Sequence, residues 1–206
     1  MFGISPDAIF QIPALLVALT VHEYGHARVA VSLGDPTPRV LGRLTLNPIP
    51  HLDAVGLLML WIAHFGWAKP VPVNPSNLRH GKTGMLLVSL AGPAFNLMTA
   101  VICMVLYFLL ATMQLMTIEV AKVIQWMYVF NLGLAVFNLI PLPPLDGSKI
   151  VSSLLPTRTA YSYEQIAPYG PIILIALVYI GIVGAVISPI IGGLDYIIKS
   201  VIALFF

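Results

Sequence analysis

Two histidines and a glutamate stand close together in the run His-Glu-Tyr-Gly-His at positions 22–26. In a helix, His22 and His26 are four residues apart and therefore share one face. Two imidazoles at this spacing can hold one Zn²⁺, and Glu23 can take a proton from a water beside the metal. The pattern predicts a hydrolytic zinc site. The alternative interpretation is a hydrogen-bonded polar cluster that holds helices together.

A third protein ligand is needed, because catalytic zinc has three protein ligands and one open position. Cys103 is the single cysteine, so thiolate-rich sites are excluded. Asp146 is the best candidate, because it follows a helix-breaking run of prolines where irregular backbone can line a cavity. The competing interpretation is an Asp-Gly turn at the membrane interface. Asp53 is the fallback ligand, although it also suits the N-cap of a short helix.

Two further polar residues are candidates for contacts with a substrate. Asn96 lies within an apolar run, so its amide either donates to a substrate carbonyl or forms a hydrogen bond between helices. His51 lies near Asp53 and is a candidate oxyanion donor, with a solvated loop histidine as the alternative.

The composition is that of a polytopic membrane protein. Hydrophobic residues make up 59% of the 206 residues and charged residues only 9%, against about 45–50% and 25% in soluble domains. This length predicts one membrane-embedded domain over residues 1–206. The basic residues are not clustered with aromatic residues, so nothing indicates binding to nucleic acid. The start of the chain lacks the features of a cleaved signal peptide, so residues 7–32 are expected to be a retained span.

The hydropathy pattern predicts an all-α membrane protein with about six helical segments and a small β element at the interface. Apolar runs predict the main helices at residues 8–31, 52–66, 84–112, 124–140, 169–186 and 189–206. The run 52–66 is short for a full crossing, and 189–206 either spans or lies in the interface. Residues 148–155 can form a short helix. Alternating residues at 39–48 favour a strand or hairpin, and 66–74 favours an extended edge segment.

The basic residues indicate the orientation in the membrane. They fall on one side if the 52–66 segment re-enters the membrane without crossing it, and that side is cytoplasmic by the positive-inside rule. The basic residues in question are Arg28, Arg39, Arg43, Lys69, Arg79, Lys82, Lys149 and Arg158. We therefore expect a multi-pass protein of the cell membrane whose active site lies toward the cytoplasm.

Three stretches together resemble the site-2 protease family of intramembrane zinc metalloproteases. They are the His-Glu-Tyr-Gly-His run at 22–26, Gly-Pro-Ala-Phe-Asn at 92–96, and Asn-Leu-Ile-Pro-Leu-Pro-Pro-Leu-Asp-Gly at 138–147. The resemblance covers residues 8–155 and is greatest to small prokaryotic members, without a PDZ-like or nucleotide-sensing domain. Stretches like 42–48, 51–53 and 66–74 also recur in those members. One departure is that Asn138 and Pro141 stand somewhat upstream of the Asp-Gly pair.

The resemblance implies one Zn²⁺ per chain, held by His22, His26 and Asp146, with Glu23 as general base and Asn96 as a substrate contact. It also implies a three-helix catalytic core within residues 8–155, followed by C-terminal helices at about 168–206. The implied activity is an endopeptidase that cuts membrane proteins or peptides in or near their transmembrane segments within the lipid bilayer. Regulated intramembrane proteolysis and clearance of membrane peptides are both compatible roles. The resemblance does not indicate an oligomeric state.

Other classes of function use the same residues. A membrane transporter or metal-binding protein could use the polar cluster as a cation path. A scaffold could bind single-span helices without cutting them, and a zinc hydrolase could act on a lipid ester or amide.

Overall fold

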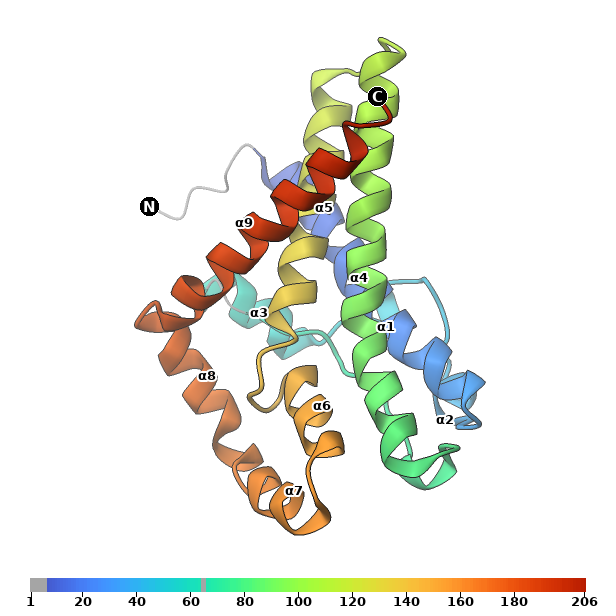
Figure 1. Ribbon diagram of the computed structural model, residues 1–206, viewed down its shortest axis with the longest axis vertical. Coiled ribbons are helices and arrows are strands. Elements are labelled where there is room, and N and C mark those ends of the chain that lie inside the picture. The colour runs from blue at the N-terminus through green and yellow to red at the C-terminus, as the bar shows by residue number, and fades with distance from the viewer. Residues whose placement is uncertain (1–6, 64–65) are drawn as a thin grey trace.

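The computed structural model describes residues 7–63 and 66–206, and this part of the chain forms helices and no β-strand (Figure 1). Four helices are long and apolar enough to cross a membrane: α1 (Ala8–Ser32), α4 (Gly81–Thr112), α5 (Ile118–Phe137) and α9 (Ile182–Ile202). The shorter α-helices are α2 (Thr37–Val40), α3 (Ala54–Ala63), α6 (Asp146–Leu154), α7 (Thr157–Glu164) and α8 (Gly170–Tyr179). The expected all-α membrane protein is thus confirmed, with nine α-helices in the described residues where about six helical segments were expected.

Helices α1, α4 and α5 pack against one another in all three pairs. Small residues permit close packing between membrane helices, and the buried residues of α1 include Ala14, Ala18, Ala27 and Ala30. At Gly25 the approach to α4 is so close that an added Cβ would lie 2.9 Å from the Ala91 carbonyl oxygen. The bundle therefore places the histidine face of α1 directly against α4.

Contacts between helix ends fix the directions of the four long helices. Asp7, before α1, pairs with Lys122 of α5, and Phe108 of α4 lies against Phe206 after α9. At the other end, the Arg79 N–H, before α4, donates to the carbonyl oxygen of Leu33, which follows α1. Helices α1 and α5 therefore run one way and α4 and α9 the other, and the loops that carry most of the basic residues gather at one end (Figure 1).

The strand or hairpin expected at residues 39–48, which was to form the small β element, is wrong. Residues 37–40 form the short helix α2, Gly42 adopts a left-handed φ of 67°, and Ile49–His51 form one 3-10 turn. The prolines on either side of this stretch lack the N–H groups that a strand pairing needs.

The 66–74 segment is irregular and keeps one antiparallel bridge, between Leu52 and Ala68. Helix α3 has ten residues, Ala54–Ala63, where a short helix over 52–66 was expected; positions 64–65 lie outside the described residues.

The C-terminal helices also differ from the expectation. The break lies at Gly181, whose φ of 81° suits glycine, and not between residues 186 and 189. Pro189 lies inside α9, which is tolerated because neighbouring groups can satisfy the backbone at a membrane proline. The last segment is consequently a helix of 21 residues that could span the bilayer, whereas α8 has only 10 residues.

Candidate metal centre

Helix α1 presents His22 and His26 to α4 at a glycine. Both side chains are buried, and their ring centroids are 4.7 Å apart. The space beside the rings exists because residue 92 lacks a side chain: an added Cβ would overlap His26 Nε2 and would lie 2.7 Å from His22 Nε2. Gly92 therefore leaves open a cradle around the two ring nitrogens.

Asp146 is far from the two histidines in the sequence but lies beside their Nε2 atoms. It is the first residue of α6, after the proline-rich loop that leaves α5. The Gly147 N–H donates to the Asn138 carbonyl oxygen at 2.7 Å, and a Cβ at Gly147 would overlap the carbonyl oxygens of Leu139 and Ile140. The loop can fold back this tightly only with glycine there, and this fold-back carries Asp146 to α1.

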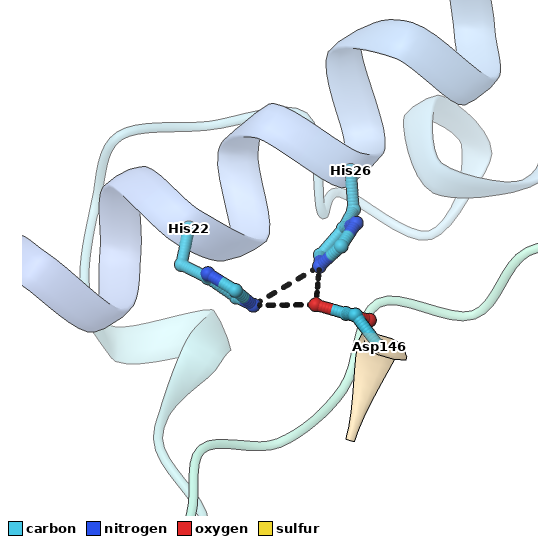
Figure 2. A group of neighbouring side chains, drawn as sticks. All are labelled: His22, His26 and Asp146. Atoms are coloured by element: carbon cyan, nitrogen blue, oxygen red, sulfur yellow. Dashed lines mark hydrogen bonds and ion pairs between the residues drawn. The ribbon is translucent and has the colours of Figure 1, made fainter. Parts of the chain in front are cut away.

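The three side chains converge on one point (Figure 2). Asp146 Oδ2 lies 3.0 Å from both His22 Nε2 and His26 Nε2, and the two Nε2 atoms are 3.1 Å apart. All three residues are buried.

Hydrogen bonds on the far side of each ring determine which nitrogen carries a proton. His26 Nδ1 lies 2.7 Å from the carbonyl oxygen of Val88, which can only accept, so Nδ1 is the donor. His22 Nδ1 lies 2.6 Å from Asn96 Oδ1 and is the donor there for the same reason. In the neutral rings both Nε2 atoms therefore carry lone pairs directed toward Asp146.

Three acceptor atoms thus lie together without a donor among them. Asp146 Oδ2 is buried and receives no hydrogen bond from any described residue. Acceptors at such distances repel unless a cation lies between them. A tetrahedral zinc with bonds of about 2.0–2.1 Å would hold its ligands about 3.3 Å apart, so a small adjustment fits these residues to zinc.

Glu23 is one position round the helix from His22 and is buried. Its Oε2 accepts a hydrogen bond of 2.8 Å from the backbone N–H of Val71, in the irregular segment before α4. The carboxylate is therefore held in one orientation by a neighbouring backbone group.

Asn96 is placed behind His22 and not in a position to donate to a substrate. It is fully buried, and its two amide hydrogens go to the carbonyl oxygen of Ala18 and to Oδ1 of Asn131. Asn131 in turn donates to the Met127 carbonyl oxygen. The sequence analysis missed Asn131, although a second asparagine in an apolar span is a signal that could have found it.

His51 and Asp53 lie away from the three acceptors. His51 is fully buried, and its Nε2 donates to the carbonyl oxygen of Thr45, so neither an oxyanion contact nor a solvated loop histidine is found. Asp53 accepts from the Gly56 N–H at the start of α3, which is the capping role considered for it. Among the described residues, the group that could hold a metal is His22, His26 and Asp146.

Known proteins support the same chemistry. The profile of the family described as peptidase family M50 matches residues 108–181, which contain Asp146. A protein of Bacillus subtilis (strain 168) described as the zinc metalloprotease YwhC is 38% identical over 206 residues, covering 95% of this chain and 92% of its own. The zinc metalloprotease Rip2 of Mycobacterium tuberculosis (strain H37Rv) is 32% identical over 82% of this chain and 66% of its own. No solved structure matched the chain.

The similarity to YwhC extends over nearly the whole of both proteins, so it covers the histidine motif on α1 as well as the Asp-Gly pair. The described structure brings these distant parts together as a set of nitrogen and oxygen ligands. The chain therefore belongs to peptidase family M50, the site-2 protease family, and is a zinc metalloprotease with apolar helices suited to a membrane.

Proposed function

We propose that this protein hydrolyses peptide bonds in or near the transmembrane segments of membrane proteins, with one Zn²⁺ held by His22, His26 and Asp146. The observation that carries the proposal is the meeting of three buried acceptor atoms, 3.0–3.1 Å apart, with no donor among them. When bound, zinc supplies the Lewis acidity that polarises a carbonyl and makes water a nucleophile near neutral pH.

Glu23 is the proposed general base. It follows the first histidine directly on α1 and interacts electrostatically with His26, so its carboxylate can take the proton of the attacking water. It then returns that proton to the leaving amine of the cleaved peptide bond. The Val71 N–H keeps the carboxylate oriented meanwhile, and burial of the site limits competing water.

The proposed binding surface for substrate is the backbone of Val71 and Val73. A substrate helix must unwind first, because its carbonyl oxygens are engaged in its own hydrogen bonds. In the described part of the chain, the Val71 carbonyl and both backbone groups of Val73 form no internal hydrogen bond. They can therefore accept an unwound substrate as an added strand beside Glu23.

The proposed site faces the cytoplasm and belongs to a single domain. His22 lies about 21 Å along α1, counted as fourteen steps of 1.5 Å from Ala8, nearer the end of α1 that leads into the basic loops. By the positive-inside rule, that end is cytoplasmic. Helices α1, α4, α5 and α6 form the proposed catalytic core, and α8 and α9 complete the domain. Regulated proteolysis and peptide clearance both fit this layout.

A cleavage assay with metal analysis tests the proposal. The protein is purified in detergent, its zinc is measured, and single-span peptides of varied sequence are incubated with it and examined by mass spectrometry. We expect about one zinc per chain and cleavage that a chelator abolishes and added zinc restores. Glu23→Gln should keep zinc and lose cleavage, while Glu119→Gln, at an exposed position, should retain both.

The alternatives give different results in the same experiment. A scaffold would bind peptides equally well with Glu23→Gln and cut none. A transporter would show zinc flux in vesicles, and a lipid hydrolase would release fatty acid from the lipid and leave peptides intact. Cleavage that survives zinc removal or Glu23→Gln would overturn the proposal.

A further inference from the structure

Arg43 is a buried cation that contacts the segment supporting Glu23. It lies between α2 and the 3-10 turn, and only 5% of its surface is exposed. Its Nη1 donates to the Pro70 carbonyl oxygen at 3.1 Å, and its Nη2 to the Lys69 carbonyl oxygen at 2.5 Å. These carbonyls belong to the two residues before Val71, whose N–H donates to Glu23.

The Pro70 carbonyl and the Val71 N–H belong to one peptide unit. That unit is planar and rigid, and in the trans form its C=O and N–H point in opposite directions. Arg43 holds the oxygen side of the plane, and Glu23 receives the hydrogen side. Fixing the carbonyl therefore fixes the direction in which the N–H points at the carboxylate.

Packing alone does not account for an arginine here. Removing a guanidinium from water is costly, and the Arg43 Nε has no hydrogen-bond partner among the described residues. An apolar side chain could fill the same space without that cost. What an apolar side chain could not do is donate to two adjacent carbonyls at once, which the planar fork of arginine does.

We propose that Arg43 is a positioning residue for Glu23, which it orients through the Pro70–Val71 peptide unit. The inference rests on the proposed role of Glu23 as general base. Arg43 touches neither the attacking water nor the metal ligands, so its loss should misalign the carboxylate and leave zinc in place. Small misplacements of a catalytic group can lower a rate by about a hundredfold.

The test removes, in separate variants, the hydrogen bond on each side of the Pro70–Val71 peptide unit. Arg43→Ala removes the group that holds the carbonyl, and Val71→Pro removes the N–H that meets Glu23 while keeping the same peptide unit. Val71 already precedes Pro72, which favours extended backbone at position 71. Arg39→Ala, a nearby exposed arginine, is the matched control. For each variant, kcat and KM are measured on a single-span peptide that the unaltered protein cleaves, together with bound zinc.

We expect each single variant to lower kcat by about 10–100-fold, with bound zinc unchanged. KM should change much less than kcat, because both variants keep the Val71 carbonyl that is proposed to accept a hydrogen bond from substrate. The double variant should be no slower than the slower single variant, because both changes break one link. The inference would be overturned by an unchanged kcat in either zinc-loaded variant or by a rise in KM with no fall in kcat. It would also be overturned if the loss of kcat in the double variant equalled the product of the two single losses.

Two further variants keep the result decisive. If Arg43→Ala does not fold, Arg43→Lys and Val71→Pro decide, because lysine keeps the charge but lacks the fork. Arg43→Lys should still lower kcat at least tenfold, and full activity would contradict the orienting role. If Glu23→Gln is inactive while Arg43→Lys and Val71→Pro are fully active, this inference fails and the proposed function stands. Activity retained in Glu23→Gln would instead remove the proposed function itself.

Discussion

Gly92 leaves open the space that the proposed metal centre needs. An added methyl group would occupy the space beside His22 Nε2 and His26 Nε2. We expect Gly92→Ala to lower zinc affinity at least tenfold, because the rings must turn away from Asp146. Bound zinc is measured after equilibration with a competing chelator. Gly133→Ala, where an added Cβ meets nothing within 4 Å, should bind zinc normally. Normal zinc binding by Gly92→Ala would show that the ion lies elsewhere.

Asn96 accepts a hydrogen bond from His22, a proposed zinc ligand, and should therefore affect zinc binding more than substrate binding. Asn96→Leu removes the acceptor for the His22 Nδ1 proton. Loss of such a partner of a metal ligand usually costs about 10–100-fold in metal affinity or activity. Asn131→Leu leaves the bond to His22 intact and should cost less. A competition titration with a zinc chelator checks both, and equal affinities for Asn96→Leu and the unaltered protein would contradict the orienting role.

At the scale of elements, Asp35 ties the end of α1 to the segment before α4. Its buried carboxylate accepts from the N–H and hydroxyl of Thr37, the N–H of Asn74 and the side-chain amide of Asn77. Burial raises the pKa of this carboxyl, but the hydrogen bonds outweigh burial and lower the pKa below its ordinary value. A depressed pKa stabilises the fold above the unfolded value of about 3.9, and the stabilisation is lost as the pH falls toward the folded pKa.

Asp35→Asn should therefore lower the melting temperature at pH 7, because an amide offers one acceptor atom and turns N–H groups toward other donors. The expected cost is roughly 1–3 kcal/mol. The difference between the two proteins should shrink as the pH falls below about 4. The melting temperatures of both proteins are measured in detergent from pH 7 to pH 3. A difference in melting temperature that does not depend on pH would show that the charge of Asp35 does not stabilise the fold.

Sequence reasoning found the parts of the fold and site that depend on local pattern. The spacing of His22 and His26 follows from helix periodicity, and long apolar runs predict helices wherever a membrane demands them. The meeting with Asp146 was expected from the need of zinc for a third ligand, from the proline run before Asp146 and from the family resemblance. The described structure adds the fold-back at Gly147 that brings it about.

What the sequence did not reveal depends on contacts between distant segments. The pattern at residues 39–48 alternates like a strand, but its environment favours bends that bury Arg43. The guanidinium of Arg43 donates to carbonyl oxygens 26 and 27 residues further along the chain. No local pattern in the sequence predicts such partners. Asn131 stands out in the sequence as a polar residue in an apolar span, but its partner Asn96 lies on another helix and only the structure pairs them.

At the scale of the whole molecule, the basic loops are proposed to lie together on the cytoplasmic side. Cys103 is the single cysteine and is buried, so replacing it with alanine provides a background for single-cysteine labelling. Glu119→Cys lies at the end where α5 begins, and Arg158→Cys lies in α7 at the opposite end; both positions are exposed. An impermeant thiol reagent applied to intact cells without an outer barrier should label position 119 only. Labelling of position 158 before permeabilisation would reverse the proposed orientation.

The most direct test of the central claim is zinc K-edge X-ray absorption on the purified protein. We expect two imidazole nitrogens and a carboxylate oxygen at about 2.0–2.2 Å from one zinc, and no sulfur. Asp146→Ala should remove the protein oxygen or the metal itself. Zinc that keeps the same surroundings in Asp146→Ala, or that shows no imidazole scattering, would contradict the assignment of this site.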